Sequence, residues 1–299
     1  MAKSFLKAVA AIIAVAAFFN AYAKSEQLPD YTGVIVVNAK NGDVLFERNS
    51  KKLCYPASCT KLMTLYVALD AVDSGLVKLS DKVNTTSLAL SEAPSSSGLK
   101  PKDGYTLKNH FIALMVKSAN DSAVMIAQHV AKYALGKVLT TGEGDAAQFV
   151  AKMNEKAAEL GMKNTRYTSP NGLPPKNRKQ SSYDVSTPYD LAILARAIIK
   201  NHPEVLEYTS IAECTLTTEL GEKISYRNHN NLVSKPMVKM PYVDGLKTGF
   251  HNLGLFSLIL TGSKNNHRAI VCITGSPSQA VRDRIAGAFL EDALNALNW

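Results

Sequence analysis

Runs of apolar residues divide the chain into strand-like ends and a helical middle. Short runs rich in Val, Ile, Leu and Phe predict strands near the N-terminus, where Asn41-Gly42 signals a hairpin, and in the last third of the chain. Apolar residues at three-to-four spacing predict helices elsewhere. The expected strands are 33–38, 43–47, 243–248, 255–260 and 269–274, and the expected helices are 58–73, 107–116, 122–133, 146–160, 187–200 and 279–297.

This order of elements predicts an α+β fold, because strands at both ends of the chain can share one sheet around a helical middle. Segment 74–103 contains prolines, serines and a glycine without clear periodicity, and is predicted as loop. Segment 169–188 is a second long, polar stretch. Long loops in compact domains are often functional, so 169–188 is a candidate to border a site.

The N-terminal residues have the pattern of a cleavable signal peptide. Lys3 and Lys7 precede an apolar run over 8–19, and Ala21-Tyr22-Ala23 matches an A-x-A cleavage site. The 12-residue apolar run is shorter than the ~20 residues that span a bilayer. We therefore expect removal of 1–23 and an exported, periplasmic or otherwise extracytoplasmic protein without an integral membrane anchor.

Composition narrows the function classes only moderately. Removal of the signal leaves 276 of 299 residues and changes the net charge from +9 to +7. That length suits one large two-part domain or two small ones. The positive residues are scattered, which predicts a solvated surface rather than a nucleic-acid or polymer-binding patch. No C-x-x-C or H-E-x-x-H spacing is present, so neither a metal nor another cofactor is expected.

The cysteines leave several possibilities open. In an exported chain four cysteines permit three complete disulfide pairings among Cys54, Cys59, Cys214 and Cys272. Cys59 directly follows a candidate nucleophile and is a possible rival thiol. A small buried residue is the favoured interpretation of Cys59.

Three short strings carry the chemistry. They are Ser58-Cys59-Thr60-Lys61, Ser118-Ala119-Asn120 and Lys247-Thr248-Gly249. A serine is a poor nucleophile until a base takes its proton, and a lysine three residues later in a helix lies on the same face. Other S-x-x-K strings begin at Ser4 and Ser97, but only Ser58 opens a periodic apolar helix. Ser58 and Lys61 are the candidate nucleophile and base, and a second lysine nearby, Lys247, would help to keep Lys61 neutral.

With their flanking residues, these strings resemble the low-molecular-mass penicillin-binding proteins of the D-alanyl-D-alanine carboxypeptidase family, which are serine S-x-x-K peptidases. The resemblance covers nearly all of the chain after the signal. It implies a serine β-lactamase/transpeptidase-like fold, in which helices flank an antiparallel sheet beside an all-helical subdomain. Residues 24–299 would form the catalytic domain, with the helical subdomain inserted at about 80–185.

The resemblance also implies a reaction and a set of roles. Ser58 would form an acyl-enzyme with the D-Ala-D-Ala end of peptidoglycan stem peptides, and β-lactam antibiotics would be covalent inhibitors. Lys61 would accept the proton of Ser58, and Ser118 would relay protons. Substrate would be bound by Asn120, Lys247, Thr248, Gly249 and Phe250, and the N–H groups of Ser58 and Phe250 would form the oxyanion hole.

Several alternatives remain open at this stage. A DD-endopeptidase acting on cross-links is the nearest variant. A β-lactamase is less favoured, because no Glu with Asn four residues later occurs between Ser118 and Lys247. A non-catalytic wall-binding protein would have lost Ser58, Lys61 or Lys247, and none is lost.

Gly254 follows the third string one residue earlier than is usual in the family, and His251 in that turn is expected to have no role. The chain ends at Trp299 without the further β-rich domain and anchor of membrane-associated members, which makes it more similar to short, soluble ones.

Overall fold

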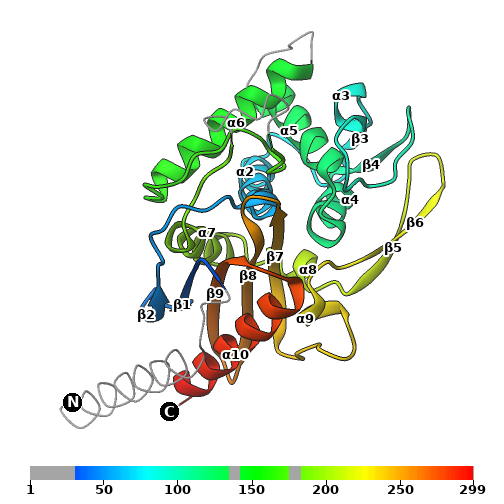
Figure 1. Cartoon of the computed structure of the whole chain (residues 1–299). Helices are drawn as coiled ribbons and strands as arrows, with labels where there is room; N and C mark the ends of the chain where they lie inside the picture. The colour runs from blue at the N-terminus through cyan, green and yellow to red at the C-terminus, as the bar shows by residue number, and fades with distance from the viewer. Residues whose placement is uncertain (1–30, 135–141, 175–182, 299) are drawn as a thin grey trace.

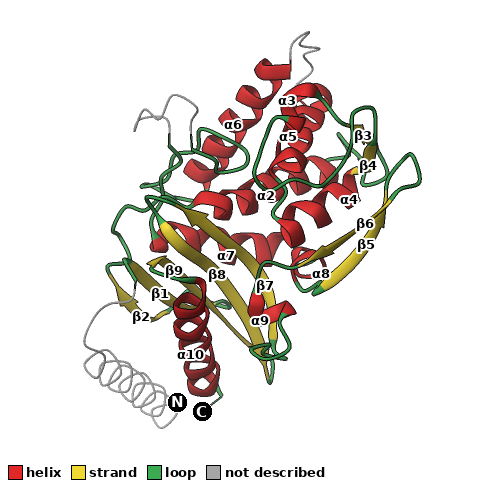
Figure 2. Ribbon diagram, turned by 45° about the vertical axis from the view of Figure 1, so that its right-hand side comes forward, coloured by secondary structure: helices red, strands yellow, loops and turns green. Residues whose placement is uncertain are grey.

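The computed structural model describes residues 31–134, 142–174 and 183–298, so the expected signal peptide lies outside the described residues. The described residues form a five-stranded sheet with helices on both faces and a mainly helical part beside it (Figures 1 and 2). Within those ranges, no helix combines the length and apolar character needed to cross a bilayer.

The main sheet joins both ends of the chain, as the sequence predicts. All neighbouring strands are antiparallel, in the order β2-β1-β9-β8-β7. The strands are β1 (Gly33–Asn38), β2 (Val44–Arg48), β7 (Val243–His251), β8 (Leu255–Lys264) and β9 (His267–Ser276).

Both faces of this sheet are buried, which explains the nearly continuous apolar runs of its central strands. Ile35 and Val37 of β1 belong to the core shared with the helical part, whereas Val34 and Val36 pack in a second core under α10 (Gln279–Leu297). Figure 2 shows α10 on one face of the sheet and α7 (Pro188–Asn201) on the other.

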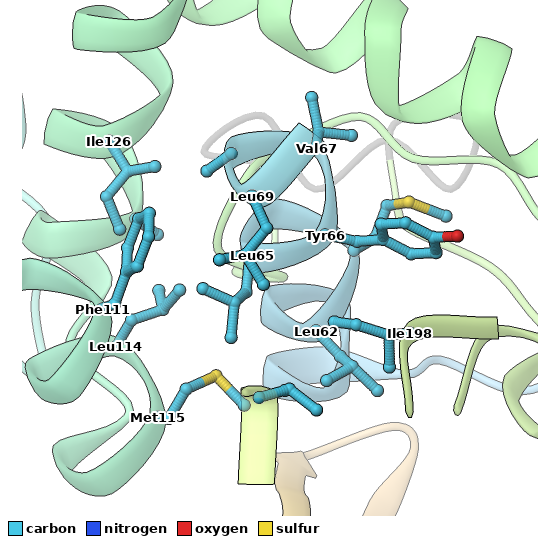
Figure 3. Packing of buried hydrophobic residues seen from close by; sticks show 14 of the residues in the cluster. Leu62, Leu65, Tyr66, Val67, Leu69, Phe111, Leu114, Met115, Ile126 and Ile198 are labelled. Carbon is cyan, nitrogen blue, oxygen red and sulfur yellow. The ribbon is translucent and has the colours of Figure 1, made fainter. Parts of the chain in front are cut away.

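The helical part surrounds α2, the central helix of the molecule. Figure 3 shows apolar side chains of α2 pointing in two directions, with Leu65 toward Phe111 and Ile126, and Leu62 toward Ile198. The helix is therefore fixed from both sides. This part contains α2 (Lys61–Asp73), α3 (Ser87–Leu90), α4 (Leu107–Ile112), α5 (Asn120–Ala134) and α6 (Gly142–Glu159), the turns η1 (Ala57–Thr60) and η2 (Ala113–Lys117), and the strand pair β3 (Lys82–Asn84) and β4 (Gly104–Thr106).

Some elements differ from the sequence-based expectation. Segment 74–103 is not all loop, since it contains β3 and α3. The sequence also did not predict a hairpin that follows α8. Its strands bury mainly Leu216 and Tyr226, so they contain too few apolar residues to show the alternation that indicates a strand. The elements of this region are α8 (Val205–Thr209), β5 (Glu213–Thr217), β6 (Lys223–Arg227) and α9 (Asn231–Ser234).

Candidate active site

Ser58 lies in the 3₁₀ turn η1, immediately before α2. The expected helix therefore begins with a tighter turn than an α-helix, but Lys61 still follows at the right distance, with its Nζ 2.9 Å from Ser58 Oγ. Ala57, just before the serine, adopts a left-handed backbone with φ 50°. That conformation costs about 1–2 kcal/mol for a residue with a Cβ, and it is maintained here by the packing around the turn.

Lys61 is fully buried, and its surroundings fix its protonation state. Burial, followed by the charge of Lys247, lowers the pKa of Lys61 well below its ordinary value. Besides Ser58, its amine contacts Asn120 Oδ1 at 2.7 Å and the Asn171 carbonyl oxygen at 2.6 Å. Both oxygens can only accept, so a neutral Lys61 amine would use its two N–H groups on them. Its nitrogen lone pair would then face the hydroxyl of Ser58.

A second buried lysine approaches from the sheet. Lys247 of β7 donates to Ser118 Oγ at 2.9 Å and to the Thr248 carbonyl oxygen at 3.0 Å. Burial lowers its pKa to about 8, so Lys247 is mostly charged at neutral pH. Ser118 sits in a left-handed conformation, with φ 59°, at the end of the π-helical turn η2. Since Lys247 donates to its oxygen, the Ser118 proton can point toward the neighbouring cleft.

The cleft has a volume of about 550 Å³ and draws its walls from all three strings. Gly249 permits this convergence, because a Cβ at that position would lie 2.6 Å from the Pro56 carbonyl oxygen, next to η1. Lys61 and Lys247 lie behind the lining and reach it through their hydrogen bonds to the two serines. The lining includes six of the eight predicted site residues, which are Ser58, Ser118, Asn120, Thr248, Gly249 and Phe250.

The sequence matches the D-alanyl-D-alanine carboxypeptidase family over residues 23–278. The chain belongs to this family. D-alanyl-D-alanine carboxypeptidase DacF of Bacillus subtilis is 31% identical over 271 residues, which are 91% of this chain and 64% of that protein. The chain therefore spans just under two thirds of the length of this curated relative.

Solved structures of penicillin-binding and transpeptidase proteins have the same fold, which confirms the expected fold class. Penicillin-binding protein D2 of Listeria monocytogenes, in an ampicillin-bound form, has a TM-score of 0.73 and 27% identity, over 89% of this chain and 98% of that one. A mutant of the Streptomyces K15 DD-transpeptidase has a TM-score of 0.78 over 90% of this chain and 100% of that one. At 22% identity, the second likeness concerns the fold alone.

Three further residues lie at the site, although the sequence did not predict them as site residues. Asn171 contributes its backbone carbonyl, and its side chain donates to Glu92 Oε2 at 2.7 Å. Arg282 of α10 lines the cleft although its side chain is almost fully buried, and it is paired with Asp283 at 2.6 Å. In the sequence, Arg282 is only a positively charged residue near the start of a helix that was expected to pack on the sheet. His251, expected to have no role, also lines the cleft and accepts from the Leu253 amide at 3.0 Å.

Cys59 agrees with its interpretation as a packing residue. Its side chain is fully buried, and this burial raises the pKa of the thiol to about 11. A thiol that remains protonated is a poor nucleophile. All four cysteines lie in the described ranges and have free thiols, so none of the three possible pairings is formed in this structure.

Proposed function

We propose that this protein is a serine DD-carboxypeptidase that hydrolyses the D-Ala-D-Ala end of peptidoglycan stem peptides through an acyl-enzyme on Ser58. The observation that carries the proposal is the 2.9 Å contact between Lys61 Nζ and Ser58 Oγ, in a buried setting that lowers the pKa of the Lys61 amine. A base in this position removes the main obstacle to nucleophilic attack by serine.

Acylation begins when the Ser58 proton moves to Lys61 Nζ. Ser58 Oγ then bonds to the carbonyl carbon of the penultimate D-Ala, and the carbonyl oxygen becomes an oxyanion. The N–H groups of Ser58 and Phe250, which both line the cleft, are the proposed donors to it. Breaking the peptide bond releases the terminal D-Ala, whose amine takes a proton from Ser118, and Ser118 in turn receives the proton that Lys61 took from Ser58.

Deacylation reverses these roles with water as the nucleophile. Lys61, neutral again, accepts a proton from the water that attacks the ester carbon, and it returns this proton to Ser58 Oγ as the ester bond breaks. Lys247 keeps its proton throughout, and its hydrogen bond to Ser118 Oγ stabilises negative charge on that oxygen during the transfer. No metal or other cofactor is needed for any of these steps.

Substrate orientation would depend on the charge and amide groups of the cleft. The carboxamide oxygen of Asn120 is engaged by Lys61, which leaves its nitrogen to donate to a substrate carbonyl. Lys247 and Thr248 place a positive charge and a hydroxyl where the terminal carboxylate of a D-Ala-D-Ala peptide would lie, beside Arg282, whose charge is paired with Asp283. β-Lactam antibiotics, which also present a carboxylate beside an acylating carbonyl, are proposed covalent inhibitors.

A DD-endopeptidase is the nearest alternative, since a cross-link presents the same type of peptide bond. Residues 24–299 are the proposed catalytic domain, with a helical subdomain over about 80–185, and cleavage after Ala23 would place it outside the cytoplasm. These boundaries and this location are supported by the sequence pattern.

Mass spectrometry of the intact protein tests the assignment. Incubation with benzylpenicillin should add one stable adduct, and a peptide ending in D-Ala-D-Ala should release free D-Ala. A cross-linked muropeptide as the better substrate would favour the endopeptidase. Rapid turnover of the antibiotic would instead indicate a β-lactamase, and no reaction with any of the three would contradict catalysis.

A further inference from the structure

A buried histidine at the end of α7 lies apart from the active site. The side chain of His202 is only 3% exposed, and its Nε2 lies 2.7 Å from Asp70 Oδ1. A carboxylate can only accept, so Nε2 carries the hydrogen and donates. In the neutral ring this leaves a lone pair on Nδ1, and Nδ1 has no hydrogen-bond partner.

This nitrogen faces two further carboxylates. Nδ1 lies 3.3 Å from Asp73 Oδ2 and 3.4 Å from Glu204 Oε1. All three atoms are within 4.8 Å of one another. In the described part of the chain, neither Asp73 nor Glu204 is ion-paired with a lysine or arginine. The nearby Lys156 pairs with Asp70 instead, at 3.0 Å.

Three electron-rich atoms pointing at one another repel unless a proton or a metal cation lies among them. The separations from Nδ1 match the edge of a tetrahedron around zinc, which is about 3.3 Å for metal–ligand distances near 2.0–2.1 Å. We propose that His202, Asp73 and Glu204 bind a divalent transition metal, with Zn²⁺ as the best fit. Asp70 would orient the histidine ring from the outside, an arrangement typical of metal-bound histidines.

The ligand set indicates the class of metal. Imidazole nitrogen combined with carboxylate oxygen suits zinc and its neighbours, whereas Ca²⁺ and Mg²⁺ prefer sets of oxygen ligands only. The side chains of Asp73 and Glu204 are 62% and 36% exposed, so both can adjust to a metal and a water molecule can take the fourth position. Asp73 is far in sequence from His202 and Glu204, so no single spacing could have revealed the complete set.

The location suggests a stabilising role and not a catalytic one. Asp73 follows Lys61 by twelve residues on α2, about 18 Å along the helix axis. The metal would join the end of the helix that carries Lys61 to the end of α7 and the start of α8. Because the unfolded chain does not assemble these ligands, binding would raise the stability of the folded protein.

The test compares metal-free full-length protein with the double variant Asp73→Asn/Glu204→Gln. Asp73 is exposed and Glu204 is only half-buried, so the variant should fold. Equilibrium dialysis against ZnCl₂ should show one zinc fewer bound to the variant than to the wild type. Zinc at about a hundredfold excess over its Kd should raise the Tm of the wild type by several degrees, and MgCl₂ should not. Glu155→Gln, an exposed carboxylate on α6 that is paired with Lys152, is the matched control and should behave as the wild type.

Equal zinc stoichiometry and equal Tm shifts in the wild type and the double variant would overturn the proposal. So would a wild-type Tm that zinc leaves unchanged, because His202 would then be a protonated imidazolium neutralised by its carboxylates. The rate of penicillin acylation is a separate readout. It should be the same in the variant and the wild type, since the site is remote from Ser58.

Discussion

Gly172→Ala should disable the active site without touching any group that takes part in the chemistry. Gly172 follows Asn171, whose carbonyl oxygen accepts from Lys61, and it has a left-handed φ of 78°. A Cβ there would lie 1.9 Å from the Ala57 carbonyl oxygen, whereas real contacts stay above 3.0 Å. The backbone next to Ser58 must therefore move by about 1.1 Å. A misplacement of about 1 Å typically costs about a hundredfold in rate, or ~2.7 kcal/mol in the barrier.

Gly161→Ala is the matched control. Gly161 has nearly the same φ, 77°, but a Cβ there would meet nothing within 4 Å. Both variants pay the cost of about 1–2 kcal/mol for a left-handed alanine, and only Gly172→Ala adds the clash. The assay is the second-order rate of acylation by a fluorescent penicillin, with Tm recorded in parallel. The reasoning fails if Gly172→Ala acylates as fast as Gly161→Ala, or if both are slowed to the same extent.

Three further predictions concern the site. Ser58→Ala should form no penicillin adduct by intact mass, while Cys59→Ala should keep most of its labelling rate; an adduct on the first variant would reassign the nucleophile. Acylation by a peptide with a free carboxylate should fall above about pH 8, where Lys247 loses its charge. Lys247→Arg should move this fall in rate to higher pH. A peptide with an amidated end should show no such fall with either protein. Asp184→Asn should lower the free energy of unfolding by about 1–3 kcal/mol, because this buried carboxylate accepts several hydrogen bonds next to the nucleophile turn; an unchanged denaturation midpoint would contradict this.

Features set by local sequence could be predicted well. The apolar run of β1 has the composition of a strand buried on both faces, and both faces are buried. The pairing of Ser58 with Lys61 follows from three-residue spacing in any helical turn, so it held although the turn is 3₁₀ and not α. The expectation that the two ends of the chain share a sheet needed only the order of elements, and it is confirmed.

Features that depend on convergence in space could not be predicted. The Asn171 carbonyl is a backbone group, which leaves no signature in residue type. Arg282 lies in a helix whose apolar spacing indicates packing, and its place in the cleft depends on how α10 crosses the sheet. The β5–β6 hairpin buries few residues, so its strand signal is weak. Asn171 and Arg282 required the fold, because the groups that they meet in the site are far away in sequence.

The two buried lysines illustrate why the fold must bring distant strings together. Burial lowers the pKa of both lysines, and at Lys61 the charge of Lys247 adds to this effect. The proposed mechanism needs a pH window in which Lys61 is a neutral base while Lys247 is still a cation. Below this window Lys61 gains a proton and cannot accept one from Ser58. Above it Lys247 loses the charge that would bind the substrate carboxylate. Lys247→Gln would remove the repulsion, raise the pKa of Lys61 and move the acidic limb of acylation to higher pH. If that limb stays where it is in the wild type, burial alone keeps Lys61 neutral and the second lysine serves only to bind substrate.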